Sequence, residues 1–402
     1  MRIAVVHNLP SGGARRALGA HVRGLCALGH HVELFSPSTA DESFHPVAPA
    51  GIPRHEFPVP GPPGREASLF GTPGIATAAR GARLLRALFR VHEHMARSID
   101  QGGFDVVLAG HDQFTHAPLA LRWLRTPSAY YCQEPLRFVY DAPVGLQPRP
   151  AGWLRGLVRG SATRAAQRLL GPMDRASVMA ATSLLANSAF SHESIMRAYG
   201  RAARVVYLGI DAGLFRPTGE PREGFVLSVG AMHPAKGYDF IVRALAMLPA
   251  ATRPALMIVS DRGYGVFRTA LETLARESGV MLEVKSRIDD AELVRLMNRA
   301  GAVVYAPYLE PFGFVPLEPM ACHAPVVAVA EGGVRESVRH DETGLLAPRD
   351  ERQFAAAVER MLGDASLAER LGRAGRESVL AGWTWDASCR ALERELDALA
   401  AR

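Results

Sequence analysis

The sequence predicts an α/β protein with two doubly wound parallel sheets. Apolar runs of strand length alternate with longer helical patterns through most of the chain. This alternation starts afresh at Phe225, after a segment (211–224) that contains Pro217, Gly219 and Pro221. The length of 402 residues also exceeds what one hydrophobic core usually organises, so two lobes are expected.

The first half of the chain begins directly with a strand. Ile3–Val6 is an apolar run, and Gly12-Gly13 provides a turn into a helix that ends at Gly29. A Pro/Gly-rich stretch, about residues 46–74, is expected to form a long loop. We expect strands at 3–6, 32–35, 104–109, 127–135 (running into a loop) and 184–187, and helices at 14–28, 81–98 and 173–181.

The second half repeats the order of strand and helix. We expect strands at 225–229, 255–259, 282–285, 302–306 and 326–328, and helices at 238–248, 269–277, 290–298 and 316–322. Ligands of doubly wound sheets bind outside the carboxyl ends of the strands. Two facing lobes therefore predict a cleft, with a site that straddles both.

Composition narrows the class of protein. Hydrophobic residues make up 48% of the chain and charged residues 21%, and no apolar run reaches the roughly 18 residues that cross a bilayer, which excludes disorder, collagen and an integral membrane protein. The four cysteines form no C-x-x-C pair and no metal-binding spacing. The formal charge of +6 suits an anionic partner without choosing one. The first residues enter a strand without a secretory signal, so a cytoplasmic location is expected.

The segment 308–321 carries the strongest chemical signal. Glu310 follows a strand, and Glu318 falls in the first turn of the next helix, which has Pro316 near its first position. The start of a helix offers unpaired N–H groups and a positive dipole end to a phosphate, and a carboxylate beside it can accept both hydroxyls of a ribose. Glu310, on a loop that ends in Gly313, could reach a second sugar. Glutamates at this spacing are weak evidence alone, because Glu is common in a first helical turn.

Further motifs accompany these glutamates. They are, in order, Gly12-Gly13, Gly29–Val32, Leu185–Ser188, Tyr207–Asp211, Leu214–Pro217, Val229-Gly230, Lys236-Gly237, Ala324–Ala328, Glu331–Gly333, Glu336, Thr343–Leu346 and Trp383–Asp386. Together they resemble the family-4 glycosyltransferases, which are retaining enzymes of the GT-B fold, over nearly the whole chain. The resemblance implies a Rossmann-like acceptor domain (1–206), a Rossmann-like nucleotide-sugar domain (207–380) and a C-terminal helix (381–402) that returns to the first domain.

The resemblance also implies roles for individual residues. Lys236 would neutralise the donor diphosphate, and Glu318 would hold the ribose. Glu310 would hold the donor sugar and stabilise the developing charge at C1. Backbone at Gly12, Gly13, Gly313, Phe314 and Val315 would assist at the diphosphate, and Arg287 and Ile288 would flank the base. No Asp-x-Asp is present, so no metal and no cofactor beyond the nucleotide-sugar substrate are expected.

Two positions depart from the family pattern. Ala231 stands where the family usually has a phosphate-binding Arg, and Arg262 in the next turn is a candidate substitute. Gln133 stands where the family often has a His near the donor sugar. His111 is the next candidate, and we group it with Glu310 and Lys236 as expected catalytic residues. The expected acceptor side comprises His111, Gln133, Glu134 and Arg137. Each of these candidate site residues also has a purely structural interpretation, as a turn glycine, a solvated charge or a structural histidine.

An arginine-rich segment after Tyr140 interleaves apolar residues with Arg149, Arg155, Arg159, Arg164, Arg168 and Arg175. Such a helix could lie on the anionic inner face of a membrane, as a lipid-linked acceptor would require. It could equally be a helix whose arginines cover the first lobe. Arg80, Arg83, Arg86, Arg90 and Arg97 on the preceding helix add modestly to the membrane interpretation.

These observations lead to a retaining, metal-independent transferase that moves a hexosyl group from UDP- or GDP-hexose to a glycan, a lipid-linked or a natural-product acceptor. A non-catalytic nucleotide-sugar-binding protein on the same scaffold is the alternative. An NAD-dependent oxidoreductase is disfavoured because the first turn, residues 8–13, lacks G-x-G-x-x-G. A nucleic-acid binder ranks last, because the basic residues are not interleaved with exposed aromatics.

Overall fold

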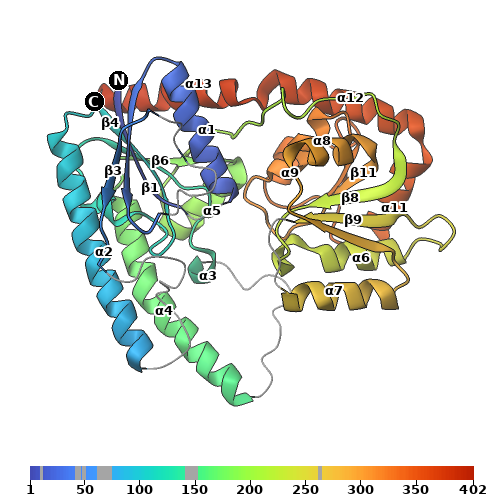
Figure 1. Cartoon of the computed structure of the whole chain (residues 1–402), viewed down its shortest axis with the longest axis horizontal. Coiled ribbons are helices and arrows are strands. Elements are labelled where there is room, and N and C mark those ends of the chain that lie inside the picture. The colour runs from blue at the N-terminus through green and yellow to red at the C-terminus, as the bar shows by residue number, and fades with distance from the viewer. Residues whose placement is uncertain (10–11, 41–46, 48–50, 61–74, 141–152, 261–264) are drawn as a thin grey trace. The chain divides into compact units, whose positions relative to one another are not determined.

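The computed structural model describes residues 1–9, 12–40, 47, 51–60, 75–140, 153–260 and 265–402, and it divides into two compact units (Figure 1). The described residues of unit 1 lie within Met1–Ala142, Pro148–Leu208 and Trp385–Arg402, and those of unit 2 lie within Gly209–Thr384. Each unit contains one parallel sheet. Among the described residues, no helix is long and apolar enough to cross a membrane.

Unit 1 contains a seven-stranded sheet in the order β3-β2-β1-β4-β5-β6-β7, and each neighbouring pair is parallel. All seven residues of β4 are buried, as expected for a central parallel strand covered on both faces. The strand order reverses between β1 and β4, which makes this the topological switch point. The strands are β1 (Arg2–Asn8), β2 (His31–Pro37), β3 (Arg54–Phe57), β4 (Val106–Asp112), β5 (Ser128–Tyr131), β6 (Ser183–Ala186) and β7 (Arg204–Val205).

Helices cover both faces of this sheet (Figure 1). The C-terminal helix packs on α1 and contacts β4 and β5, whereas α2 contacts β2, and both α2 and α4 contact the short η1. Gly24 permits the close approach of α1 to the C-terminal helix, because a Cβ there would lie 2.1 Å from Cys389 Sγ. The helices are α1 (Gly13–Ala27), α2 (Ile75–Gln101), η1 (Leu119–Arg122), α3 (Arg137–Tyr140), α4 (Trp153–Ala180), α5 (Ala189–Tyr199) and α13 (Trp385–Ala400).

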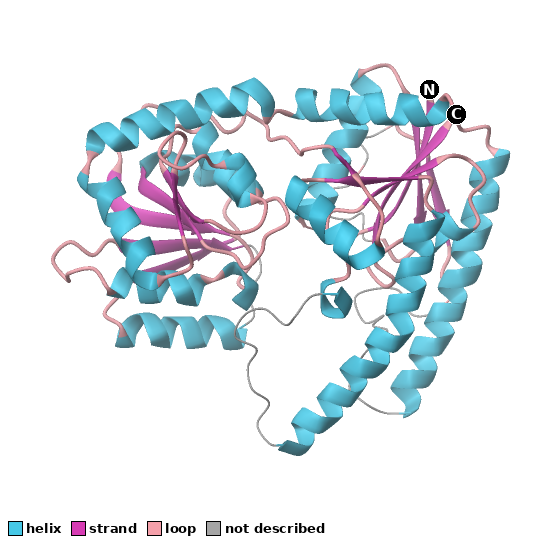
Figure 2. Cartoon of the chain, turned by 180° about the vertical axis from the view of Figure 1, so that it is seen from behind, coloured by secondary structure: helices cyan, strands magenta, loops and turns pink. Residues whose placement is uncertain are grey.

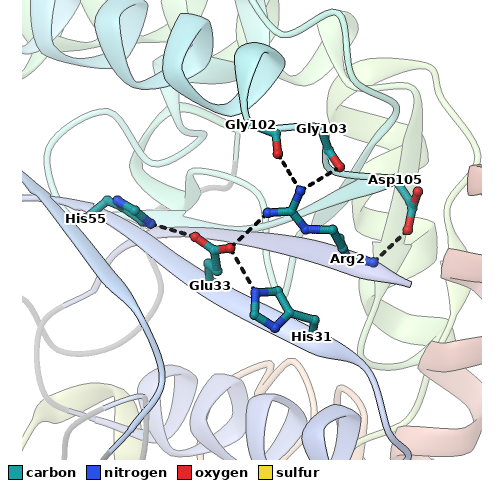
Figure 3. A network of polar contacts seen from close by, with 7 residues as sticks. All are labelled: Arg2, His31, Glu33, His55, Gly102, Gly103 and Asp105. Carbon is teal, nitrogen blue, oxygen red and sulfur yellow. Dashed lines mark hydrogen bonds and ion pairs between the residues drawn. The ribbon is translucent and has the colours of Figure 1, made fainter.

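A polar network joins the amino-terminal ends of strands in this sheet (Figure 3). Glu33 on β2 accepts hydrogen bonds from His31 and, across to β3, from His55 at 2.7 Å. Arg2 on β1 donates to Glu33 and to the carbonyl oxygens of residues 102 and 103, and its own N–H donates to Asp105. Burial raises the pKa of Glu33, but these hydrogen bonds outweigh burial and lower it overall. The network lies at the end of the strands opposite to the expected ligand site.

Unit 2 contains a six-stranded sheet in the order β10-β9-β8-β11-β12-β13, also parallel throughout. Figure 2 shows helices on both faces of it. Its switch point lies between β8 and β11. The strands are β8 (Glu223–Val229), β9 (Ala255–Ser260), β10 (Leu282–Ser286), β11 (Ala300–Tyr305), β12 (Val326–Val329) and β13 (Leu345–Ala347). The helices are η2 (Pro234–Lys236), α6 (Tyr238–Ala246), α7 (Gly265–Glu277), α8 (Asp290–Arg299), α9 (Phe314–Ala321), α10 (Val334–Ser337), α11 (Glu351–Gly363) and α12 (Ala365–Gly382).

The structure corrects several expectations. The stretch predicted as a loop contains β3, an edge strand whose first three residues are exposed. The helix predicted at 81–98 begins at Ile75, and the one predicted at 173–181 is the end of α4, which continues through Pro172. The helix predicted at 316–322 begins at Phe314, so Pro316 is its third residue and Glu318 lies in its second turn. Helices α5, α11 and α12 and strands β7 and β13 were not predicted.

Candidate active site

Three candidate donor residues of unit 2, Lys236, Glu310 and Gly313, lie on the connections that follow β8 and β11, the two strands of the switch point. After β8 the chain turns at Gly230, whose φ of 147° suits glycine, and Tyr238 donates a 2.9 Å hydrogen bond to the Gly230 carbonyl. The short helix η2 then ends at Lys236, and Gly237, which follows it, has a φ of 68°. A Cβ on Gly237 would lie 2.0 Å from the Ala306 carbonyl oxygen, so the turn that carries Lys236 presses against the end of β11.

Lys236 and Glu310 meet at this junction. The Nζ atom of Lys236 donates to Glu310 Oε2 at 2.8 Å, and both side chains are about one-quarter exposed (24% and 22%). The loops are joined by backbone too, because the Tyr308 N–H donates to the Ala235 carbonyl at 2.9 Å. The structure therefore brings together two of the predicted site residues that the sequence separates by 74 positions.

The start of α9 lies directly after this loop. Gly313 precedes the helix with a φ of 80° and has no side chain with which to cap it, and the N–H groups of Phe314 and Val315 lie in the first turn. Glu318 is 3% exposed. Burial raises the pKa of the Tyr305 hydroxyl, and the neighbouring carboxylates of Glu310 and Glu318 raise it further. Both glutamates thus lie near one phenol at the carboxyl end of β11.

The residues predicted to flank the base lie further out. Arg287 and Ile288 follow β10, the edge strand two places from β8, and connect it to α8. Arg287 is exposed and has a φ of 57°, which is uncommon for a residue with a side chain. Asp289 caps α8 by accepting from the Glu292 N–H. Arg262 lies outside the described residues.

In unit 1 the glycine turn lies at the carboxyl end of β1. Gly12 precedes α1 with φ 156° and ψ −172°, a conformation that glycine tolerates best. No atom of the described residues lies within 4 Å of a Cβ placed on Gly12, so conformation, not space, favours glycine there. Gly12 and Gly13 are exposed, and the Gly12 carbonyl accepts from Arg16 N. Their contribution to a shared donor site stays a prediction.

His111, near the end of β4, uses both ring nitrogens within the protein. The Gln133 N–H donates to Nε2 at 3.0 Å, which places the ring proton on Nδ1, from which it bonds to the Tyr130 hydroxyl at 3.1 Å. Burial, and then the charge of His116, lower the pKa of His111 well below its ordinary value. The ring is therefore neutral at pH 7 and fixes the backbone of Gln133. Its predicted catalytic role stays a prediction.

The other acceptor-side candidates follow β5. Glu134 and Arg137 form an ion pair at 3.0 Å. The Gln133 carbonyl accepts from Ser191 at 2.7 Å, and His116, which has a φ of 65°, contacts the Glu134 carbonyl at 2.7 Å. The structure gathers these residues around the loop after β5. Among the described residues, no group of three or more His, Cys, Asp or Glu is placed to hold a metal ion.

The sequence analysis missed Arg349, which lies between β13 and α11 and donates to the carbonyls of Ala306 and Pro307 at the start of the loop that carries Glu310. No local pattern marks it, because its contacts reach residues more than 40 positions away.

Comparison with known proteins bears on the whole chain. Residues 214–378 match the family model "Glycosyl transferases group 1", and residues 12–211 match "Glycosyl transferase 4-like domain". The glycogen synthase of Mycobacterium tuberculosis is 30% identical over 397 residues, which covers 92% of this chain and 87% of that protein. The chain is a family-4 (group 1) glycosyltransferase. It is a nucleotide-sugar-dependent enzyme of the hexosyltransferase class, which confirms the predicted family and activity over the non-catalytic and oxidoreductase alternatives.

Solved structures confirm the GT-B fold of this family member. Sucrose-phosphate synthase from Thermosynechococcus elongatus matches with a TM-score of 0.72 at 22% identity, covering 100% of this chain and 99% of that one. Anabaena HepE, solved with UDP and glucose, matches with a TM-score of 0.69 at 19% identity, covering 99% of this chain and 100% of that one.

A second sequence relative matches part of the chain. The D-inositol 3-phosphate glycosyltransferase of Thermobispora bispora is 32% identical over 253 residues, which covers 57% of this chain and 58% of that protein.

Proposed function

We propose that this glycosyltransferase moves a hexosyl group from UDP- or GDP-hexose to a glycan, a lipid-linked or a natural-product acceptor, with retention of configuration at C1. The observation that carries the proposal is the Lys236–Glu310 pair, with 2.8 Å between Nζ and Oε2, at the switch point and beside the start of α9. A cation, a helix start and two carboxylates are what binding of a diphosphate, a ribose and a sugar requires.

The diphosphate would take the Lys236 ammonium together with the N–H groups of Phe314 and Val315. These donors, with the positive end of the α9 dipole, stabilise negative charge that grows as the bond from C1 to the diphosphate oxygen breaks. Their charge makes a bridging metal unnecessary in this proposal. Glu318 would accept the ribose hydroxyls, and Glu310 would accept hydroxyls of the hexose.

The acceptor would attack C1 from the face that the diphosphate leaves. The acceptor oxygen forms a bond to C1, the bond from C1 to the diphosphate breaks, and the acceptor proton passes to the departing phosphate oxygen. This step needs no protein nucleophile and no separate base. It is therefore compatible with a His111 ring whose Nε2 lone pair already accepts from the Gln133 N–H.

An anionic membrane surface is the proposed location of a lipid-linked acceptor. Arg80, Arg83, Arg86, Arg90 and Arg97 are all exposed, and their spacing of three, four and seven places them on one side of α2. A Mycobacterium tuberculosis relative, 32% identical over 222 residues, is named as a phosphatidylinositol monomannoside mannosyltransferase, which gives a precedent for a lipid acceptor in the family. Of the arginine-rich segment after Tyr140, Arg149 and the side chains of Arg155, Arg159 and Arg164 lie outside the described part of the chain.

A thermal-shift panel tests the donor assignment. UDP, GDP, ADP and TDP and their common hexose conjugates are added to the wild type, to Glu318→Ala and to Glu359→Ala, in which an exposed glutamate on α11 is removed. A nucleotide that binds the folded state raises the melting temperature. We expect the nucleotides of one base to raise the melting temperature of the wild type and of Glu359→Ala, but not that of Glu318→Ala. No response of the wild type to any nucleotide would overturn the donor site.

A further inference from the structure

Arg349 lies where two connections of unit 2 meet. One is the turn between β8 and α6 that carries Lys236 (residues 230–237, the Lys236 turn), and the other is the loop between β11 and α9 that carries Glu310 (residues 306–313, the Glu310 loop). Its Nη1 donates to the Ala306 carbonyl at 3.0 Å, and its Nη2 donates to the Pro307 carbonyl at 2.6 Å. The Ala306 carbonyl is the atom that presses against Gly237, and Nη1 itself would lie 3.4 Å from a Cβ on Gly237. One guanidinium thus contacts the start of the Glu310 loop and approaches the turn that carries Lys236.

Glu331 fixes the orientation of this guanidinium. Nε and Nη2 of Arg349 each donate to one carboxylate oxygen of Glu331 at 2.7 Å, a bidentate pair with both side chains mostly buried (16% and 25% exposed). The guanidinium carbon also lies 3.8 Å from the centre of the Tyr308 ring. Only a planar guanidinium group can make the bidentate pair, the carbonyl hydrogen bonds and the ring contact at once, and a lysine ammonium cannot reproduce them.

The residues after Glu331 hold the far end of the same loop. Gly333 N donates to the Glu310 carbonyl at 2.9 Å. Gly332 has a φ of 58°, and a Cβ there would lie 2.3 Å from the Glu310 carbonyl oxygen. The backbone of Glu310 therefore rests on the turn that begins at Glu331, while Arg349 ties the side chain of Glu331 to the beginning of the loop. Leu309, between them, has a φ of 45°, a conformation that surrounding contacts must maintain.

We infer that Arg349, through Glu331, is a positioning residue that sets the place of the Glu310 carboxylate and thereby the recognition of the hexose. The inference rests on the proposed function, in which Glu310 contacts the sugar. Arg349 itself touches no substrate in this scheme. Its effect should therefore appear in the binding of the sugar moiety and not in the binding of the nucleoside diphosphate.

The test compares two ligands for each variant. Dissociation constants are measured by calorimetry for the nucleoside diphosphate that the wild type binds and for its hexose conjugate. The variants are Arg349→Lys, Glu331→Gln, Glu310→Gln and the double variant Arg349→Lys/Glu310→Gln, with Arg352→Lys, an exposed arginine on α11, as the matched control. Glu331→Gln keeps the shape of the side chain and so provides a second route if Arg349→Lys folds poorly.

We expect Arg349→Lys and Glu331→Gln to raise the ratio of the sugar conjugate's dissociation constant to that of the diphosphate by at least about fivefold, and the double variant to add little to Glu310→Gln. Arg352→Lys should leave the ratio unchanged. Equal weakening of both ligands, or full additivity in the double variant, would overturn the inference while leaving the donor site intact. A wild type that binds neither ligand would instead overturn the proposed function, and this inference with it.

Discussion

The Nζ atom of Lys236 lies 2.8 Å from Oε2 of Glu310, so the cation proposed for the donor diphosphate is already paired with the carboxylate proposed for the donor sugar. The two roles are therefore coupled. When the diphosphate binds Lys236, the ammonium must share or leave Glu310, and the carboxylate becomes available to hydroxyl groups of the hexose. Binding of one half of the donor thus prepares the residue that recognises the other half.

Glu310→Gln should consequently separate binding from transfer. Removal of the competing carboxylate charge frees Lys236, and a partly exposed ion pair contributes up to about 1 kcal/mol, so the nucleoside diphosphate should bind up to about fivefold more tightly. Transfer should fall by roughly a hundredfold or more, because the developing charge at C1 loses its carboxylate. Calorimetry with the diphosphate and initial rates of transfer measure the two effects. Weaker diphosphate binding in Glu310→Gln would contradict the exchange of partners.

Gly237→Ala should damage the Lys236 turn more than its backbone angle alone explains. Gly200 has nearly the same φ, 70° against 68°, but no atom of the described part of the chain lies within 4 Å of a Cβ added there, whereas at Gly237 the Ala306 carbonyl oxygen lies at 2.0 Å. Gly200→Ala should therefore cost about 1 kcal/mol from backbone strain, and Gly237→Ala at least about 2 kcal/mol more. Chemical denaturation measures both values. Similar losses in the two variants would show that the close approach of Gly237 to β11 is absent in solution.

Local patterns made the sheets and the Lys236, Glu310 and Glu318 candidates predictable. Apolar runs identify buried parallel strands directly, and these three residues lie in short motifs. The edge strand β3 could not be found in this way, because only the last of its four residues is buried and it lies in a Pro/Gly-rich stretch.

Tertiary contacts determine the remaining features of the site. The hydrogen bonds of Arg349 join residues 18 to 43 positions apart, and the engagement of both His111 nitrogens depends on strand β5 and the loop after it. A helix that starts at Phe314 and carries Pro319 inside it also departs from the usual place of proline. Sequence periodicity contains none of this information.

The basic side of α2 should bind anionic lipid bilayers. Arg83→Gln/Arg86→Gln/Arg90→Gln removes three exposed positive charges, each worth about 1 kcal/mol near an anionic surface. Co-sedimentation with vesicles of phosphatidylglycerol and phosphatidylcholine should show a loss of at least about tenfold in binding, and vesicles of phosphatidylcholine alone should bind neither protein. Arg352→Gln/Arg373→Gln/Arg394→Gln removes the same charge from exposed positions on α11, α12 and α13 and serves as the control. Equal losses for both triple variants would indicate a net-charge effect only.

His21 should make unit 1 sensitive to acid. Its Nε2 donates to Ser388 Oγ at 2.9 Å, because the Ser388 hydroxyl proton is given to the Tyr207 carbonyl. Burial lowers the pKa of His21 from 6.5 to about 4, so the folded state keeps the ring neutral while the unfolded state takes up a proton below pH 6.5. The contribution of His21 to stability is therefore complete above pH 6.5 and is lost as the pH falls from 6.5 towards 4.

Between pH 7 and pH 5 this proton uptake should remove about 2 kcal/mol from the free energy of unfolding. His21→Gln keeps a donor for Ser388 and has no titratable ring. Its free energy of unfolding should therefore fall by about 2 kcal/mol less than that of the wild type between pH 7 and pH 5. Urea titrations at the two pH values measure the difference, with His94→Gln, an exposed histidine on α2, as the control. An unchanged pH dependence in His21→Gln would mean that the α1–α13 interface admits the charged ring.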